Sequence, residues 1–159
     1  MAFQDFQATA SDNFKFGLFM FWKLPSAFFC GVRLRQIDAQ KAVVSVPFKW
    51  LSQNPFKSIY FACQAMAAEM STGVLGLGHT DGRNPKVSML VIGLQGQYFK
   101  KATERIYFTC EEGMVVAAAI DKAIATGEGQ TVAMKSIGRT KAGEVVSEFV
   151  ITWSFKARG

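Results

Sequence analysis

The fold is decided by residues 54–77, which read NPFKSIYFACQAMAAEMSTGVLGL. Alanine and methionine favour helix, and this run is apolar on nearly every side, so it predicts a long helix that its surroundings bury. Asn54 and Ser58 are both plausible N-caps, Pro55 suits a first turn, and the sequence leaves the start of the helix open. A loop is expected to follow, because glycine and proline recur at Gly76, Gly78, Gly82 and Pro85.

The segments on both sides of this helix have strand patterns. Residues 32–39 alternate in polarity and residues 41–49 are rich in valine, so the two predict a hairpin with a short turn between them. Beyond the helix, strands are expected at residues 87–99, 105–110, 130–140 and 144–156, with an alanine-rich helix at 114–126 that ends at Gly127. A long helix wrapped by an antiparallel β-sheet is an α+β layout.

The N-terminal region is rich in phenylalanine, with eight of the 15 Phe residues lying between Phe3 and Phe29. We expect an aromatic helix at about residues 11–23 that Pro25 ends. Its aromatic face packs on the core or on a partner subunit, or else the helix lies on a membrane surface or forms a wall of an acyl pocket. No membrane span is expected, since two lysines and a proline interrupt the apolar run.

Length and charge narrow the class of protein. A chain of 159 residues fits one domain, residues 1–159, and the net charge of +6 fits an anionic partner: a nucleic acid, a phosphorylated cofactor or a membrane. No helix-turn-helix, RNA-recognition or zinc pattern is present, so nucleic-acid binding is not expected. The chain also starts without a basic secretory leader, and a cytoplasmic location is expected.

Cysteine and histidine are too few for several kinds of site. Cys30, Cys63 and Cys110 are odd in number and far apart, which argues against a disulfide framework or a zinc site and favours buried thiols in a reducing compartment. His79 is the only histidine, and it lies in the glycine-rich stretch expected to be a loop. Mechanisms that need two histidines are excluded, and no metal site is predicted.

Glu69 is the main candidate for a chemical role. Its neighbours on the helix are alanine, methionine and glycine, and burial among them would raise the pKa of the carboxyl group and make it a stronger base. Such a base can activate water for attack on a carbonyl carbon, or attack that carbon directly. The alternative is a surface carboxylate, or one paired with Arg33, Arg35 or Arg105.

Other polar residues of the segment have two possible roles each. Thr72 and Gly73 follow Glu69 by three and four residues on the same helix face, so the Thr72 hydroxyl could hold the attacking water or could bond to its own helix carbonyl. Asn54 could orient water or a carbonyl group, or be only an N-cap. Gln64 could line the opposite wall or bond to a strand.

One segment resembles the loop and helix of the hotdog-fold acyl-CoA thioesterases related to the phenylacetate-pathway enzyme: it contains Asn54, then Tyr60-Phe61-Ala62 and then Glu69. Their pattern is an Asn, a His-Gly-Gly six residues later and an Asp nine residues beyond that His, and the spacings here are the same. The segment is most similar to an uncharacterised, DUF4442-like hotdog branch whose helix carries Glu among alanines. The strand order extends the resemblance over about residues 30–156.

The resemblance implies a hotdog fold, an antiparallel sheet around a long central helix, and an enzyme that hydrolyses acyl-coenzyme A without any further cofactor. It implies Asn54 and Glu69 as catalytic residues, to which the helix spacing adds Thr72, and a homodimer or dimer of dimers in which Asn54 of one chain faces Glu69 of the other. Backbone N–H groups at the positions of the family's His-Gly-Gly would polarise the thioester carbonyl. The substrate-binding residues it implies are Tyr60, Phe61, Ala62, Lys100 and Lys101, and Gly73 is added because it lies on the Glu69 face of the helix.

The chain departs from the family pattern at two places. Tyr60, Phe61 and Ala62 replace His-Gly-Gly, and Lys57 stands where a glycine is usual. Lys100 and Lys101 close the long strand, where lysine can neutralise the phosphates of coenzyme A or simply be solvated. Because the His-Gly-Gly is altered, a non-catalytic acyl-CoA-binding or lipid-binding protein is the main alternative, and a hotdog dehydratase, which needs a histidine in its site, ranks lower.

Overall fold

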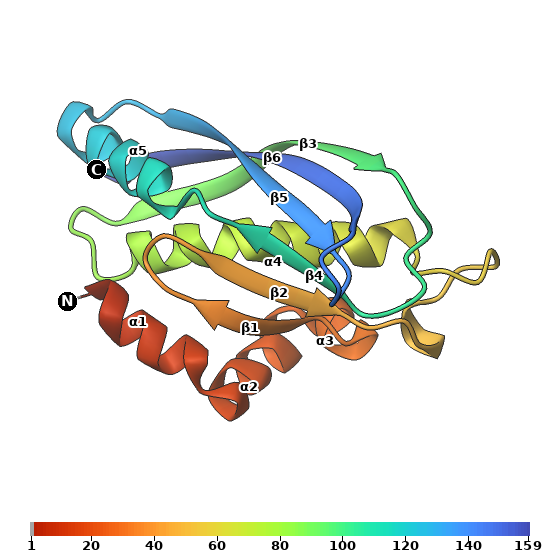
Figure 1. The fold of residues 1–159 in the computed structure, drawn as a ribbon. Coiled ribbons are helices and arrows are strands. Elements are labelled where there is room, and N and C mark those ends of the chain that lie inside the picture. The colour runs from red at the N-terminus through yellow and green to blue at the C-terminus, as the bar shows by residue number, and fades with distance from the viewer. Residues whose placement is uncertain (1) are drawn as a thin grey trace.

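A helix of 20 residues, α4 (Phe61–Thr80), runs through the centre of the molecule, and an antiparallel sheet curls around it (Figure 1). The computed structural model describes residues 2–159. The six strands follow the order β1-β2-β4-β5-β6-β3 across the sheet. They are β1 (Arg33–Ile37), β2 (Ala42–Val46), β3 (Val87–Tyr98), β4 (Ile106–Cys110), β5 (Gln130–Arg139) and β6 (Val145–Ala157). The other helices are α1 (Ala2–Ser11), α2 (Asn13–Lys23), α3 (Pro25–Cys30), the 3-10 turn η1 (Trp50–Ser52) and α5 (Gly113–Thr126).

The core lies between α4 and the concave face of the sheet. Strand β6 alternates, so that Phe149, Ile151, Trp153 and Phe155 all point inward, and α4 is buried along most of its length because its small residues let these side chains approach. This arrangement is the hotdog fold, and the predicted α+β class and the predicted β1–β2 hairpin are confirmed.

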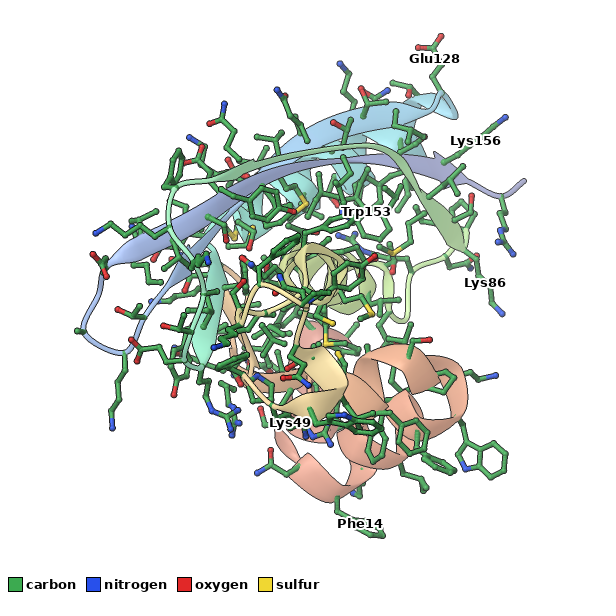
Figure 2. The ribbon with its side chains drawn as sticks, turned by 90° about the vertical axis from the view of Figure 1, so that its right-hand side faces the viewer. Phe14, Lys49, Lys86, Glu128, Trp153 and Lys156 are labelled. Atoms are coloured by element: carbon green, nitrogen blue, oxygen red, sulfur yellow. The ribbon has the colours of Figure 1, made fainter. Side chains whose placement is uncertain are left out.

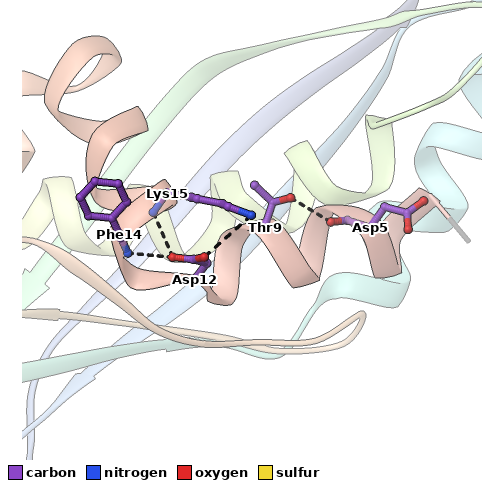
Figure 3. A network of polar contacts seen from close by, with 5 residues as sticks. All are labelled: Asp5, Thr9, Asp12, Phe14 and Lys15. Atoms are coloured by element: carbon purple, nitrogen blue, oxygen red, sulfur yellow. Dashed lines mark hydrogen bonds and ion pairs between the residues drawn. The ribbon is translucent and has the colours of Figure 1, made fainter.

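The N-terminal region differs from the prediction of one helix over residues 11–23. Asp12 caps a helix that begins at Asn13, because its carboxylate accepts hydrogen bonds from the N–H groups of Phe14 and Lys15 at 3.0 and 3.1 Å (Figure 3). Residues 2–11 form a further helix that the prediction lacked. Pro25 does not only end α2, since it also occupies the first turn of α3, where its missing N–H is no loss.

Both ends of α4 also differ from the prediction. Neither Asn54 nor Ser58 caps it: the N-cap is Tyr60, whose side chain makes no capping bond. At the other end Gly76 and Gly78 are helical, and the expected loop begins only after Thr80. A Cβ at Gly78 would lie 2.4 Å from the ring of Phe3, and one at Gly76 would lie 2.7 Å from Met89, so these glycines serve close packing within the helix.

His79 therefore belongs to the last turn of α4 and not to a loop. It is buried against the ring of Phe3, and its Nε2 hydrogen-bonds with the carbonyl oxygen of Ala39 at 2.9 Å. Burial lowers the pKa of His79, and nearby Arg83 acts in the same direction. The histidine ties the end of α4 to the β1–β2 turn.

All three cysteines are free and buried, as predicted. The neighbouring Cys63 thiol, the N–H of Val32 and the charge of Lys49 lower the pKa of Cys30 to about 7. Burial, together with the charges of Glu112 and Glu111, raises the pKa of Cys110 to about 12. Within residues 2–159, no helix has both the length and the apolar character that crossing a membrane requires.

Candidate functional site

The predicted site residues line two separate hollows. The first, which we name the Glu69 pocket, lies between α4, the N-terminal helices and the sheet, with a volume of about 220 Å³. The second, the loop pocket, lies at the N-terminal end of α4 and has a volume of about 560 Å³. Glu69 and Gly73 line the first, and the other predicted residues at a pocket surface line the second: Asn54, Tyr60, Phe61, Lys100 and Lys101.

Glu69 is half-buried on α4 in the Glu69 pocket. Within the described residues its carboxylate makes no ion pair or hydrogen bond; Arg33 and Arg35 donate elsewhere, to backbone carbonyls and to Ser45. Arg105 also faces Ser45, so the alternative that the sequence left open, a pairing of Glu69 with one of these arginines, is absent from the described residues. Burial raises the pKa of Glu69. A carboxylate with this environment is a stronger base than an exposed one.

The walls of the Glu69 pocket are almost entirely apolar. Phe16, Phe19 and Leu24 come from the N-terminal helices, and Met89 and Trp153 come from the sheet. Lys23 is the one basic residue among the lining side chains. The sequence offered the helix at residues 11–23 as one possible pocket wall, and Phe16, Phe19 and Lys23 belong to it. Met89 and Trp153 were assigned to no site, although the inward alternation of β6 would have placed Trp153 opposite α4.

Trp153 and Thr72 hold the pocket wall to the helix. The indole Nε1 of Trp153 donates to the Thr72 hydroxyl at 2.8 Å, and that hydroxyl donates to the carbonyl oxygen of Glu69 at 2.8 Å. A Cβ at Gly73 would lie 3.1 Å from the Trp153 ring and 3.5 Å from Glu69 Oε1, so glycine makes room for both groups. Thr72 is fully buried, and its hydroxyl bonds to its own helix carbonyl, the alternative that the sequence left open.

Asn54 organises the loop that precedes α4. Its Oδ1 accepts from the N–H groups of Phe56 and Ser58 at 2.9 and 3.2 Å, and its Nδ2 donates to the Ser58 hydroxyl at 3.0 Å. Lys57 lies inside this loop with a φ of 60°, in the left-handed region. The position where the family pattern that the sequence resembles has glycine is therefore one that glycine suits best.

The start of α4 faces the loop pocket. Tyr60 and Phe61 are both largely exposed there, with their rings 4.8 Å apart between centroids. Within residues 2–159, the N–H groups of Phe61 and Ala62 have no hydrogen-bond partner. Such first-turn donors suit an oxyanion or a phosphate. Gln64 is buried below them, and its side chain bonds to Ser147 and to the carbonyl oxygen of Ile59.

Lys100 and Lys101 lie on the rim of the loop pocket. Lys100 pairs with Glu144, and Lys101 donates to the carbonyl oxygen of Phe56 at 3.2 Å. Both lysines are exposed. Their charges are therefore available to an anion at this rim, although each already has a weak protein partner.

One chain cannot bring the two hollows to the same reacting atom. Phe61 and Glu69 are eight residues apart on one helix, which is about 12 Å along its axis. His79 lines neither hollow. The described part of the chain also contains no group of three His, Cys, Asp or Glu side chains placed to hold a metal ion.

Several solved structures share this fold at low sequence identity. A Pseudomonas aeruginosa protein described as of unknown function and as a probable thioesterase superposes with a TM-score of 0.76 and 14% identity, over 98% of this chain and 95% of that one. A Chlorobaculum tepidum protein of unknown function has a TM-score of 0.76 and 15% identity, over 92% and 94%. A Haemophilus influenzae thioesterase has a TM-score of 0.66 and 10% identity, over 91% and 90%.

These likenesses show a common fold. No curated protein matches the chain. The family model described as a domain of unknown function, DUF4442, matches residues 15–155, and the chain therefore belongs to the DUF4442 family.

Proposed function

We propose that the protein is an acyl-CoA thioesterase in which Glu69 acts as the base. The observation that carries this proposal is an unpaired, half-buried carboxylate with a raised pKa in an apolar pocket of a hotdog fold. The proposal also draws on the two structural neighbours whose descriptions name them thioesterases. An apolar pocket suits an acyl chain, and the carboxylate suits activation of the water that cleaves its thioester.

Glu69 first accepts a proton and later donates it. It accepts the proton from a water molecule while the water oxygen bonds to the thioester carbon, and the carbonyl oxygen gains negative charge. The C–S bond then breaks, the acyl group leaves as a carboxylic acid, and the thiolate of coenzyme A takes the proton from Glu69. Direct attack by the Glu69 carboxylate, followed by hydrolysis of the anhydride, gives the same products.

The loop pocket would hold the rest of the substrate. The free N–H groups of Phe61 and Ala62 would stabilise the oxyanion that forms in the transition state. Lys100 and Lys101 would neutralise phosphates of the nucleotide. A pocket of about 560 Å³ with an apolar wall and a basic rim suits pantetheine followed by a phosphorylated nucleotide.

Two copies of the chain are needed to combine these parts, because Phe61 and Glu69 of one chain are too far apart. Strand β3 supplies a surface for such pairing: in residues 2–159 it pairs only with β6, so its other edge is open. It carries no charged residue and no proline over 12 residues, and Leu90, Ile92 and Leu94 are more than half exposed. An open apolar edge of this kind is a template for pairing with a second copy.

Hydrolysis of a panel of acyl-CoAs of increasing chain length tests the activity. We expect turnover of at least one substrate, and a loss of about 10²–10⁴-fold in kcat on Glu69→Gln. The exposed Glu104→Gln is the matched control and should leave turnover unchanged. Equal turnover of the two variants would remove Glu69 from the mechanism. Tight binding of acyl-CoA without hydrolysis by the wild type would favour the non-catalytic binding protein.

Mixing two inactive variants tests whether the site is shared. Glu69→Gln keeps an intact loop pocket, and Asn54→Ala keeps an intact Glu69 pocket. Random reassembly as dimers would make half of the molecules mixed, each with one complete site, so about a quarter of wild-type activity should return. A site contained in one chain would give no recovery on mixing.

A further inference from the structure

The N-terminal helices and η1 expose a group of large apolar, mostly aromatic, side chains to solvent. Its main side chains are Phe14, Leu18, Phe21, Trp22, Phe29 and Trp50, and Phe14 and Trp50 are 79% exposed. Ring contacts join three of them: Phe21 stacks edge-on with Trp22 and lies 5.9 Å from Phe29 between centroids. We name this the aromatic surface. In Figure 2, Phe14 projects from the outer end of the N-terminal helices, away from the rest of the molecule.

Helix α2 has two apolar faces and only one of them is covered. Phe16 and Met20 point inward and are buried. Phe14, Leu18 and Trp22 recur every four residues and point outward, which is the spacing of a second apolar stripe. The Asp12 cap fixes the first turn of α2 and so fixes this orientation (Figure 3). A helix that is apolar on both faces needs a partner for the second face.

The chain around this surface carries more positive than negative charge. Residues 12–69 contain seven basic residues and three acidic residues, Asp12, Asp38 and Glu69, so they carry a net charge of +4. The basic residues are Lys15, Lys23, Arg33, Arg35, Lys41, Lys49 and Lys57. Lys15 and Lys23 lie in the first and last turns of α2, and Lys15 pairs with Asp12 at 3.9 Å. Arg33 covers the Phe28 ring at 4.4 Å, and Lys49 lies over Gly31 at the end of α3.

We propose that the aromatic surface docks on an anionic lipid membrane, with α2 lying in the interface and not crossing it. Aromatic side chains would enter the headgroup region while the lysine stems extend their charges to the lipid phosphates. The charge argues against a second copy of this chain as the occupant. A symmetric contact through this surface would set Lys15, Lys23 and Lys49 of one copy against the same charges of the other.

Vesicle co-sedimentation of the full chain tests the docking. Binding to phosphatidylcholine mixed with phosphatidylglycerol should exceed binding to phosphatidylcholine alone, and should weaken as salt rises. Phe14→Ser with Trp22→Ser should weaken binding at least about tenfold. Met114→Ser with Val115→Ser is the matched control, because both side chains are 55% exposed on α5 and lie outside the aromatic surface. Equal binding by the two double variants would overturn the proposal.

Tryptophan emission supplies an independent readout. Trp22 and Trp50 are exposed and Trp153 is buried, so docking should shift the emission to shorter wavelength by drying the exposed indoles. Lys15→Gln with Lys49→Gln should abolish the preference for the anionic vesicles. Sedimentation of the Phe14→Ser, Trp22→Ser double variant without lipid tests whether the surface binds protein instead. If this variant loses self-association while its vesicle binding is unchanged, the surface is a protein interface and the proposal is wrong.

Discussion

The Glu69 pocket is the more enclosed of the two hollows and is bounded by packed side chains from three parts of the chain, whereas the loop pocket is the more open one and is bounded by one loop and the ends of two elements. In the first, Trp153, Thr72 and Gly73 fix one another through hydrogen bonds and close contact. In the second, Asn54 holds a loop that contains a residue at positive φ, and the lysines on its rim are exposed. The enclosed pocket is suited to orient a reactive group, and the open one to admit a large, charged part of a ligand.

The largest stability effect should come from the enclosed pocket. Thr72→Val keeps the shape of the side chain but removes the acceptor for Trp153 Nε1, which leaves a buried N–H unpaired at a cost of about 1–3 kcal/mol. Thr72→Ser retains the hydroxyl and is the control. Denaturant unfolding of the two variants measures the difference, and equal midpoints would show that this hydrogen bond does not hold the pocket wall.

The pH dependence of stability should also come from the enclosed pocket. Burial raises the pKa of Glu69 in the folded chain, so the folded state keeps its proton over a pH range where the unfolded state has lost it. The free energy of unfolding therefore falls as pH rises from the ordinary glutamate pKa through the raised one. Glu69→Gln lacks this loss, so its stability advantage over the wild type should grow from acid to neutral pH.

His79 affects the pH dependence of stability in the opposite direction, and this effect cancels when the wild type is compared with Glu69→Gln. The pKa of His79 is lowered on folding, so the unfolded state binds the extra proton, and this contribution to stability is lost as pH falls below the ordinary histidine value. His79 is present in both proteins, and only Glu69 differs. A stability difference between wild type and Glu69→Gln that stays constant with pH would mean that Glu69 is solvated in the folded protein.

The rim of the open pocket should affect substrate binding more than turnover. Lys100→Ala with Lys101→Ala should raise the KM for acyl-CoA by a few-fold, on the order of the energy of exposed charge pairs, with little change in kcat. The effect should shrink with salt and with acyl-pantetheine, which lacks the nucleotide. Lys122→Ala with Lys156→Ala removes two exposed lysines that line neither pocket and is the control. If acyl-CoA and acyl-pantetheine weaken equally, the two lysines do not contact the nucleotide.

The smallest effect concerns the loop backbone. Lys57 has a φ of 60°, a conformation that costs most residues about 1–2 kcal/mol and glycine almost nothing. Lys57→Gly should raise the free energy of unfolding by roughly 0.5–1 kcal/mol, after the greater freedom of glycine in the unfolded chain is subtracted. Lys49→Gly, at a φ of −152°, should lower the free energy of unfolding. If both substitutions lower the free energy of unfolding, the Lys57 side chain itself stabilises the loop.

The sheet and the central helix could be predicted because their patterns are local. The alternation of polar and apolar residues predicted the strands, and the run of small apolar residues in α4 predicted a buried helix. The end of α4 could not be predicted, since glycine usually marks a helix end, whereas Gly76 and Gly78 lie within the helix and leave room for Met89 and Phe3. Helix α1 did carry a signal, because Phe3, Phe6 and Ala10 have helical spacing.

The burial of Glu69 could be predicted, but the separation of the candidate residues into two pockets could not. An acidic residue among alanines indicates burial, and Glu69 is half-buried without a partner. That Asn54 and Glu69 line different hollows depends on the length of α4 and on where its first turn lies, and the sequence left that start open. The Trp153–Thr72 bond joins residues 81 positions apart, a distance over which sequence patterns give no pairing.

Helix α2 belongs to both the aromatic surface and the Glu69 pocket: Phe16, Phe19 and Lys23 line the pocket, while Phe14 and Trp22 face outward. Any ligand that enters the pocket and displaces α2 also changes the position of the outward side chains. The two binding equilibria then share one free energy of coupling, and linkage requires that each ligand change the affinity for the other by the same factor. Occupancy of the pocket could thus be read from the fraction of protein on a membrane, without following any chemical reaction.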